Sequence, residues 1–379
     1  MDACNKTATC LAPERGNSMR MKSTSAMVLR FAVSLLLTSC HRNFGVLRDE
    51  AISGPHQFEI KSTLVFFIQG DGSYTYHDGS GKQLEADQEI LKQAMAVAAS
   101  CPRAEVFIFQ QKPKRKWLFL VDRPDGEFHY FRNGAQLAGG SYHRHTNLSE
   151  LDSECEILRT YRGTGSEERV SGFLYFGHAL AEQGGESLRQ SMSVRGLADG
   201  LSRLLSAAGA NLRKFDLVAL SACYSGTPGI VAALAPYSRY ILASPDDLHL
   251  AYLDIQPLRH FSEVRISEVQ NFAREMAQHS FARLKEWTQT SITLAVYDIE
   301  RVAPFLNEMQ KLQPAGQWGQ SQNCHPPVPV EYCDCVDGPF ATAEMPSTGV
   351  EVYYQPPRFG RLKNKTKHSG WACWEVISK

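Results

Sequence analysis

The sequence has no net charge and no long uninterrupted apolar run. Forty Lys and Arg residues balance forty Asp and Glu residues in a chain of 379. A neutral chain has no general electrostatic attraction to nucleic acid or to acidic partners. Residues 26–37 are mostly apolar, but Arg30 and Ser34 interrupt them, and a bilayer span needs about 20 apolar residues. We therefore expect no nucleic-acid partner, and we do not interpret this stretch as a membrane-spanning helix.

The same stretch has the order of parts found in a signal peptide. Basic Arg20 and Lys22 precede the apolar segment, which ends in Leu37-Thr38-Ser39-Cys40. This ending resembles a bacterial lipobox, in which the cysteine thiol receives a diacylglycerol. We therefore interpret residues 1–39 as a lipoprotein signal peptide, with 1–18 as an extended start or the product of a misplaced start codon. An ordinary signal peptide, with Cys40 incidental, is the alternative.

Lipidation at Cys40 implies a location in the cell envelope. The next residue is His41, and the absence of Asp there favours the outer membrane, by resemblance to lipoproteins of Gram-negative bacteria. Residues 40–61 are polar, and we expect them to form a tether between the lipid and the folded domain. A compartment outside the cytosol also permits disulfide bonds.

Ten cysteines are too few for a disulfide scaffold in a chain of this length. Four of them gather late in the sequence, at Cys324, Cys333, Cys335 and Cys373. With His325 they could suggest zinc, but Cys333 and Cys335 are closer together than the spacing of about two to four residues in structural zinc sites. We therefore expect no metal, and a disulfide that joins Cys324 or Cys373 to Cys333 or Cys335. Cys101 and Cys155 either pair or stay reduced.

Short apolar runs alternate with helical periodicity along the middle of the chain. The runs favour strands at 64–69, 104–109, 170–176, 215–221 and 240–243, and the periodic segments favour helices at 87–99, 148–161, 194–208 and 227–234. Strands that alternate with helices indicate an α/β sheet with crossover connections.

Three further expectations concern the flanks of this pattern. Pro124-Asp125-Gly126 predicts a hairpin between strands at 117–121 and 127–131. Residues 262–312 are expected to be mostly helical, which completes a folded domain at 62–312. An extension at 313–379, rich in Cys and Pro, is expected to pack on this domain as loops with one short strand at 350–354.

Two reactive side chains follow apolar strands in this pattern. His178 comes after the strand at 170–176, and Cys223 comes after the strand at 215–221. Ligands of an open α/β sheet bind outside the carboxyl ends of its strands. If the two strands are neighbours, the imidazole and the thiol face each other there. The imidazole can then take the proton of the nucleophilic thiol and later protonate a leaving amine.

An anionic intermediate at such a site requires hydrogen-bond donors. The backbone N–H groups of Ala179 and Cys223 lie at suitable places in the sequence, and a helix beginning near Thr227 adds positive potential beside the thiol. A serine hydrolase is not indicated, because no G-x-S-x-G surrounds Ser225.

These residues resemble a known clan of cysteine peptidases. Gly177-His178-Ala179 and Ser221-Ala222-Cys223 resemble the His-Gly and Ala-Cys strand ends of caspases, legumains, gingipains and clostripain. The clostripain-like family is the most similar, because its nucleophile block resembles residues 215–247 and two later segments resemble residues 290–302 and 347–356. The resemblance runs in patches from about Leu64 to Pro356.

The resemblance implies a caspase-like three-layer α/β sandwich with a mostly parallel central sheet. It implies a lipid-anchored cysteine endopeptidase that cleaves a peptide or protein substrate through an acyl-thioester, with Cys223 and His178 as catalytic residues and no cofactor. Clostripain-like enzymes can mature by cleaving themselves between the histidine and the cysteine, which makes Arg189 and Arg195 candidate sites.

The sequence departs from the family at two positions. The family usually has Asp two residues before the cysteine, to receive a basic substrate side chain, but Ser221 stands here, so Asp246 or Asp247 is expected to supply the charge. Ala179 replaces the usual Gly after the histidine. One alternative is therefore an inactive clostripain-like lipoprotein that serves as a binding or assembly module at the outer membrane. A class I amidotransferase-like thiol enzyme is another, but it would require a Gly-rich elbow around the cysteine.

Overall fold

The computed structural model describes residues 59–376, with gaps at 71–74, 78–80, 114–115, 118–120, 145–150, 164–168, 181–191, 210–211, 249–251, 313–329, 338–344 and 347. The expected signal peptide, Cys40 and most of the expected tether lie outside the described residues. Arg189, Cys324 and His325 also lie outside them, so the expectations for these residues stay predictions.

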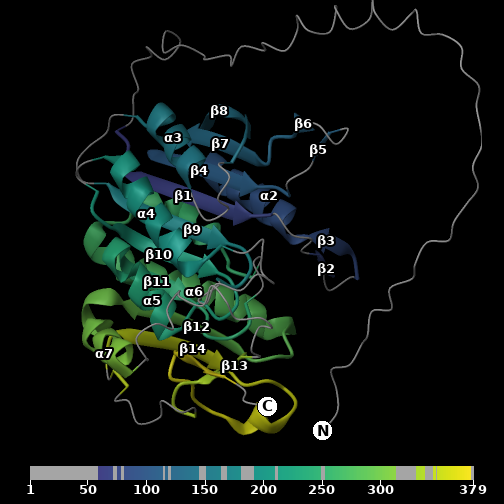
Figure 1. The fold of residues 1–379 in the computed structure, drawn as a ribbon, viewed down its shortest axis with the longest axis vertical. Coiled ribbons are helices and arrows are strands. Elements are labelled where there is room, and N and C mark those ends of the chain that lie inside the picture. Colours follow the sequence, from purple (N-terminus) through teal and green to yellow (C-terminus); the bar gives the residue numbers. More distant parts are fainter. Residues whose placement is uncertain are drawn as a thin grey trace, which may run out of the picture. The chain divides into compact units, whose positions relative to one another are not determined.

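One large sheet forms the middle of the protein (Figure 1). Its strands are β1 (Ser62–Gln69), β4 (Ala104–Gln111), β7 (Gly126–Arg132), β8 (Ala135–Tyr142), β9 (Val170–Phe176), β10 (Phe215–Ser221), β11 (Ser238–Ala243), β12 (Ile292–Asp298) and β14 (Val350–Gln355). The spatial order is β14-β12-β11-β10-β9-β1-β4-β7-β8. The neighbours from β4 to β11 pair in parallel. Two antiparallel strands extend the sheet at each edge, and only β7 and β12 run against the common direction, so the sheet is mostly parallel as expected.

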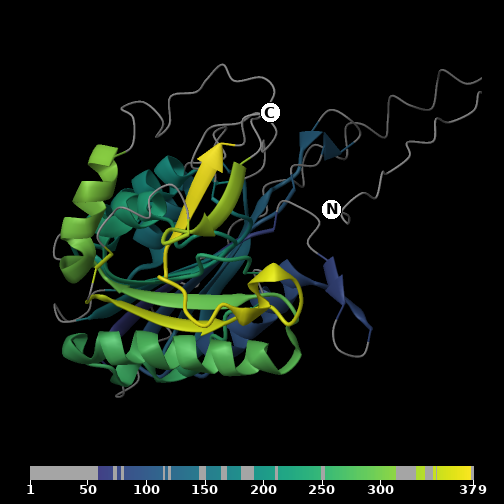
Figure 2. The same cartoon turned by 90° about the horizontal axis from the view of Figure 1, so that it is seen from below.

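Helices cover both faces of this sheet. They are α2 (Ala86–Ala99), α3 (Asp152–Tyr161), α4 (Val194–Ala208), α5 (Pro228–Leu234), α6 (Val269–Trp287) and α7 (Ile299–Leu312). Alternate side chains of a strand point to opposite faces, so Val65 and Phe67 join the apolar cluster that contains α3, α4, α5 and α7. Leu64 and Phe66 join the cluster that contains α2 and α6. Figure 2 shows α6 along one face and α7 on the other, which makes three layers.

Smaller elements complete the described chain. Three two-stranded sheets pair β2 (Thr75–His77) with β3 (Gln83–Glu85), β5 (Lys116–Trp117) with β6 (Val121–Asp122), and β13 (Val330–Asp334) with β15 (Ala372–Val376). Short 3₁₀ segments are η3 (Ala235–Tyr237), η4 (Gln256–Glu263), η5 (Ile266–Glu268) and η6 (Arg361–Asn364).

The structure corrects one expectation about individual elements and refines another. The hairpin predicted at Pro124-Asp125-Gly126 does not form, because β7 pairs with β4 and β8 while β6 pairs with β5. The segment 262–312 is mostly helical, as expected, in α6 and α7, but the apolar run ITLAVYD between them forms β12 inside the large sheet. In both cases the partner of a strand depends on the tertiary fold, which local sequence pattern does not specify.

Residues beyond 312 belong to the same folded unit as the domain. β14 is the edge strand of the large sheet and pairs with β12 over six residues, so the boundary expected between residues 312 and 313 does not end the sheet. The fully buried Trp371 packs against Tyr297 of β12, with ring centroids 4.5 Å apart, and against Phe305 of α7 at 4.9 Å. Cys335 and Cys373 form a disulfide with Cα atoms 4.8 Å apart, which confirms a pairing of Cys373 with one of the two nearby cysteines.

Candidate active site

The strands that precede His178 and Cys223 are direct neighbours in the sheet. β9 and β10 pair in parallel, with Phe176 opposite Ser221. The ladder continues one step further, because the Gly177 N–H donates to the Ser221 carbonyl at 3.3 Å. His178 lies two residues past Phe176, and Cys223 lies two residues past Ser221. Both residues therefore leave the sheet side by side at the carboxyl ends of its parallel strands.

A tyrosine beneath the chain supports the turn that carries His178. Tyr175 is fully buried, and its hydroxyl donates to Gln69 Oε1 at the end of β1 and lies 3.3 Å from the His178 carbonyl oxygen. A Cβ at Gly177 would come within 2.5 Å of this hydroxyl. Only glycine lets the backbone approach so closely, which explains the Gly-His pair in physical terms.

A left-handed residue follows Cys223. Tyr224 has φ of 51°, a conformation that is uncommon for a residue with a side chain, and its N–H donates to the Asp246 carbonyl at 3.1 Å. The chain then turns through Ser225 into α5, where the Thr227 hydroxyl accepts the N–H of Ile230 as the N-cap and Pro228 stands in the first turn. The thiol of Cys223 is half-buried and lies 3.5 Å from the Leu248 carbonyl oxygen.

The thiol and the imidazole are both held in their neutral forms. Burial, followed by the charge of Asp247, raises the pKa of the Cys223 thiol to about 11. Burial lowers the pKa of His178. Near neutral pH the thiol therefore keeps its proton while the imidazole is unprotonated. This arrangement suits a histidine that acts as a general base during nucleophilic attack.

The expected oxyanion donors lie at the same rim. Ala179 follows His178 and is half-buried, and within the described residues neither its N–H nor that of Cys223 is bonded to a neighbouring backbone carbonyl. Two backbone donors on adjacent turns are the kind of arrangement that stabilises a developing oxyanion.

The three residues expected to line a substrate pocket differ in their placement. Ser221 is fully buried within the sheet. The Asp246 carboxylate accepts a hydrogen bond from Thr293 and lies 3.9 Å from His368 Nε2, so its two oxygens face partners inside the protein. Asp247 is exposed, and it is near enough to the hydroxyl of Tyr224 and to the thiol to raise the pKa of both. Of the two carboxylates, Asp247 is thus the one that faces solvent beside the thiol.

Sequence reasoning missed several residues of this site. Thr293 and His368 carry no local signal, because they reach the site only through the tertiary fold. Tyr175 and Tyr224 are neighbours of the predicted residues in sequence, but nothing in the sequence marks their contacts. The left-handed conformation of Tyr224 has no sequence marker either, because glycine or asparagine usually occupies such a position.

The other described thiols that are buried differ from Cys223 in their surroundings. Cys101 and Cys155 lie in the two clusters on opposite faces of the sheet, so they do not pair. Burial raises the pKa of each to about 12. The Cys101 thiol donates to the Leu258 carbonyl at 3.4 Å. Both are small core residues, in contrast to the half-exposed thiol of Cys223.

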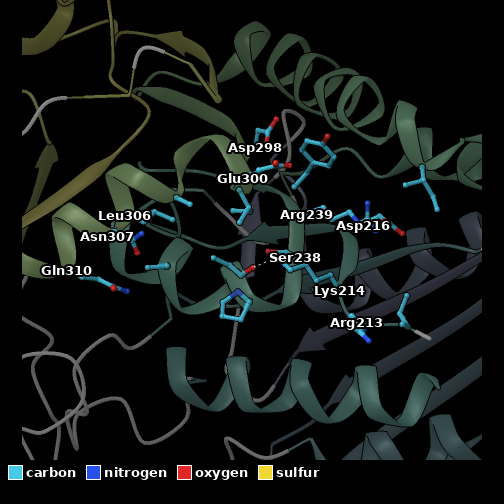
Figure 3. A pocket seen from close by; sticks show the side chains of 18 of the residues that line it. Arg213, Lys214, Asp216, Ser238, Arg239, Asp298, Glu300, Leu306, Asn307 and Gln310 are labelled. Carbon is cyan, nitrogen blue, oxygen red and sulfur yellow. Dashed lines mark hydrogen bonds and ion pairs between the residues drawn. The ribbon is translucent and has the colours of Figure 1, made fainter. Parts of the chain in front are cut away.

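A cavity of about 940 Å³ lies at the opposite rim of the sheet (Figure 3). Its walls come from the amino ends of β10 and β11, the end of β12, and α7, and they carry Arg213, Lys214, Asp216, Arg239 and Asp298. The guanidinium of Arg239 pairs with the buried Asp216 at 3.1 Å. The cavity contains neither a thiol nor an imidazole, so its size alone does not make it the reactive centre.

The residues that the structure describes contain no cluster of three or more His, Cys, Asp or Glu side chains able to hold a metal ion. Within the same residues, no helix combines the length and the apolar character that crossing a membrane would require.

The fold and the rim together define a caspase-like α/β sandwich with a thiol and an imidazole at the carboxyl ends of adjacent strands. An inactive zymogen C11 protease from Parabacteroides distasonis has a similar structure, with a TM-score of 0.54 and 13% identity over 86% of this chain and 94% of that chain. A secreted C11 cysteine protease from Bacteroides thetaiotaomicron also matches, with a TM-score of 0.43 and 11% identity over 67% of this chain and 71% of that chain.

No protein-family model matches the chain, and no curated protein matches it in sequence. The match of 0.54 extends over nearly the whole of the Parabacteroides structure. The chain therefore has the fold of the C11, or clostripain-like, proteases, and the three-layer caspase-like sandwich expected from the sequence is confirmed.

Proposed function

We propose that the protein is a cysteine endopeptidase in which Cys223 is the nucleophile and His178 is the general base. One observation carries this proposal. The parallel pairing of β9 with β10, in the register Phe176–Ser221, brings the half-exposed thiol of Cys223 and the imidazole of His178 to the same rim. The C11 fold supports the proposal, because that fold is shared with cysteine proteases.

The proposed reaction proceeds in two halves. As the Cys223 sulfur attacks the carbonyl carbon of the peptide bond, its proton passes to His178. The carbonyl oxygen becomes an oxyanion that accepts hydrogen bonds from the N–H groups of Ala179 and Cys223. When the C–N bond breaks, the His178 imidazolium protonates the leaving amine, and an acyl-thioester remains. His178 then takes a proton from water, which attacks the thioester and releases the carboxylate and the thiol.

Asp247 supports a preference for a basic substrate side chain. Its carboxylate is exposed beside the thiol, whereas Ser221 is buried and Asp246 is engaged by Thr293 and His368. A cationic side chain that pairs with Asp247 would be held next to Cys223. It would also offset the negative charge that opposes formation of the thiolate.

An irreversible thiol-directed peptide probe tests the proposed chemistry. Labelling of the intact protein should disappear in Cys223→Ala and in His178→Ala. Cys155→Ala is the matched control, because it removes a buried thiol on one face of the same sheet, and it should label normally once folded. Equal labelling of all four proteins, with no cleavage of a peptide library, would instead support an inactive binding or assembly module.

We also propose that a lipid on Cys40 anchors the enzyme in the cell envelope, at the outer membrane of a Gram-negative bacterium. The lipobox-like Leu37-Thr38-Ser39-Cys40 supports this. Cells fed an alkynyl fatty acid should incorporate it into the wild-type protein but not into Cys40→Ser. Mature wild-type protein recovered without lipid in a soluble fraction would contradict the anchor.

A further inference from the structure

The last described segment of the chain packs directly on the loop that carries Cys223. The Ala372 N–H donates to the Gly226 carbonyl at 3.0 Å, and the Tyr297 hydroxyl donates to the Gly370 carbonyl. The Gly226 N–H in turn donates to the Ser244 carbonyl at 2.8 Å. A Cβ at Gly226 would lie 2.5 Å from the Tyr297 hydroxyl and 2.7 Å from the Pro245 nitrogen. The loop therefore has no space in which to shift on this side.

His368 is the buried side chain of this segment that faces the site. Its side chain is only 5% exposed, and its ring lies 5.5 Å from the ring of Tyr354. The Gly370 N–H donates to Nδ1 at 3.0 Å. Because Nδ1 accepts, the proton of the neutral ring sits on Nε2. The Nε2 nitrogen lies 3.9 Å from Asp246 Oδ1, which is beyond a direct hydrogen bond but close enough for the N–H dipole to interact with the carboxylate in this buried setting.

Asp246 connects His368 to the nucleophile loop. Its carboxylate lies between Thr293 of β12 and His368. Its backbone carbonyl accepts the N–H of Tyr224 at 3.1 Å and the hydroxyl of Ser244 at 3.0 Å. Tyr224 is the left-handed residue next to Cys223, and such a conformation persists only where its surroundings hold it. The position of the Asp246 carbonyl therefore helps to fix the direction in which the thiol points.

Two fastenings hold the segment 365–373 in place. The disulfide between Cys335 and Cys373 ties one end. At the other end Lys365 pairs with Asp334 at 2.6 Å, and the Ser369 N–H donates to the same carboxylate at 3.1 Å. His368 Nδ1 lies 3.8 Å from Asp334. The segment is thus clamped on both sides of the histidine, which gives its imidazole a fixed position.

We propose that His368 is a positioning residue of the thiol site, which acts through Asp246 to hold Tyr224 and hence Cys223 in a reactive orientation. The catalytic part of this inference rests on the proposed peptidase function. The structural part, the coupling from His368 to the Tyr224 backbone, does not. Burial is the largest influence on the pKa of His368 and lowers it, and the positive charge of Lys365 lowers it as well. The negative charges of Asp334, Asp246 and Asp337 act in the opposite direction. The ring is therefore neutral at neutral pH, as the hydrogen bond from Gly370 requires.

His368→Ala and His368→Gln form the central comparison. The alanine variant removes the donor toward Asp246, and the glutamine variant keeps an N–H at a similar reach. If peptide cleavage is present, kcat should fall about tenfold or more in His368→Ala with little change in KM, because misplacement of a reacting group lowers the rate of the chemical step. His368→Gln should recover a large part of the loss. His279→Ala, an exposed histidine of α6, is the matched control and should match wild type.

Two readouts do not depend on peptidase activity. In His368→Ala, the pH dependence of the rate at which iodoacetamide alkylates Cys223 should differ from that of wild type. Hydrogen exchange at the Tyr224 amide should be faster in this variant than in wild type. If wild type cleaves no peptide while both readouts still respond, the proposed function fails and the positioning role stands. If thermal melting shows that His368→Ala is folded, and its alkylation rates and its exchange rate at the Tyr224 amide equal those of wild type, the positioning role is wrong.

A double-mutant cycle with Asp246→Asn tests the route of the effect. If His368 acts through Asp246, the loss in the double variant should equal that of the worse single variant, because the second change removes a contact already lost. Losses that multiply would show that the two residues act independently, and that outcome would overturn the proposal.

Discussion

The two rims of the central sheet differ in what they do with polar side chains. At the amino ends of β10 and β11, two carboxylates of the cavity wall are paired within the protein, Asp216 with Arg239 and Asp298 with Arg301. At the carboxyl ends of β9 and β10, tight backbone turns hold His178 and Cys223: Gly177 leaves no room for a side chain, and Tyr224 is left-handed. We therefore expect the paired carboxylates of the cavity to be structural, and we expect the chemistry at the rim that carries His178 and Cys223.

The largest expected effect comes from removing side chains at one rim and then at the other. Cys223→Ala should lower kcat/KM by about a thousandfold or more, because the attacking atom is lost. A variant with both Arg213→Ala and Lys214→Ala, at the cavity, should remain within about twofold of wild type. Steady-state cleavage of a peptide library measures both. Comparable losses in the two variants would mean that the cavity rim contributes to the chemistry as much as the thiol rim does.

Asp216 tests whether the cavity charges are structural. It is buried, accepts from the N–H and hydroxyl of Ser171 and pairs with Arg239. Asp216→Ala leaves these donors unpaired, so we expect it to lower the free energy of unfolding by about 3 kcal/mol. Urea unfolding measures the loss, with the exposed Asp199→Ala as control. Activity per folded molecule should stay unchanged, and a specific loss of activity would assign a functional role to this rim.

Much of the sheet could be predicted from sequence because its central strands are continuous apolar runs. β9 and β10, buried on both faces, and α4, with Ser193 as its cap and Gly209 at its end, match the predicted bounds. These elements precede His178 and Cys223, so the position of each residue at a strand end followed from local pattern, whereas the direct pairing of β9 with β10 is known only from the structure.

Other elements have weaker or misleading local signals. β8 reads AQLAGGSY and is largely exposed, which gives little strand propensity. Its hairpin with β7 is marked only by Asn133-Gly134, where both residues have positive φ, as in a type I′ turn. The contact between His368 and Asp246 joins residues more than 100 positions apart. No periodicity could reveal it, because it depends on how the last segment packs.

Gly177 and Gly140 differ in the space that each leaves for a side chain. A methyl group there would meet the Tyr175 hydroxyl at 2.5 Å, whereas one at Gly140 would meet Phe128 at an ordinary 3.5 Å. Gly177→Ala should therefore cost about 1–3 kcal/mol of stability through overpacking and should also lower activity, because it displaces His178. Gly140→Ala is the control, and we expect it to stay near wild type in both melting and cleavage. Normal activity in a folded Gly177→Ala would show that the turn tolerates displacement.

The smallest expected effect concerns the charge beside the thiol. Burial and then Asp247 raise the pKa of Cys223 to about 11. Because the fold favours the protonated thiol, this contribution to stability is present below the unfolded pKa of the thiol and is lost as pH rises toward 11. Asp247→Asn removes the negative charge but keeps the shape, so the thiol pKa should fall toward its ordinary value.

At pH 8 alkylation of Cys223 by iodoacetamide should then become about fivefold faster in Asp247→Asn, the equivalent of ~1 kcal/mol for an exposed charge near the thiol. Added salt should narrow the difference, because it screens an exposed carboxylate more than it alters burial. Asp199→Asn, which alters an exposed carboxylate of α4, should leave the rate unchanged. An unchanged rate in Asp247→Asn would instead assign the raised pKa to burial alone, and the carboxylate would then lack the influence on Cys223 that a charge-selective site requires.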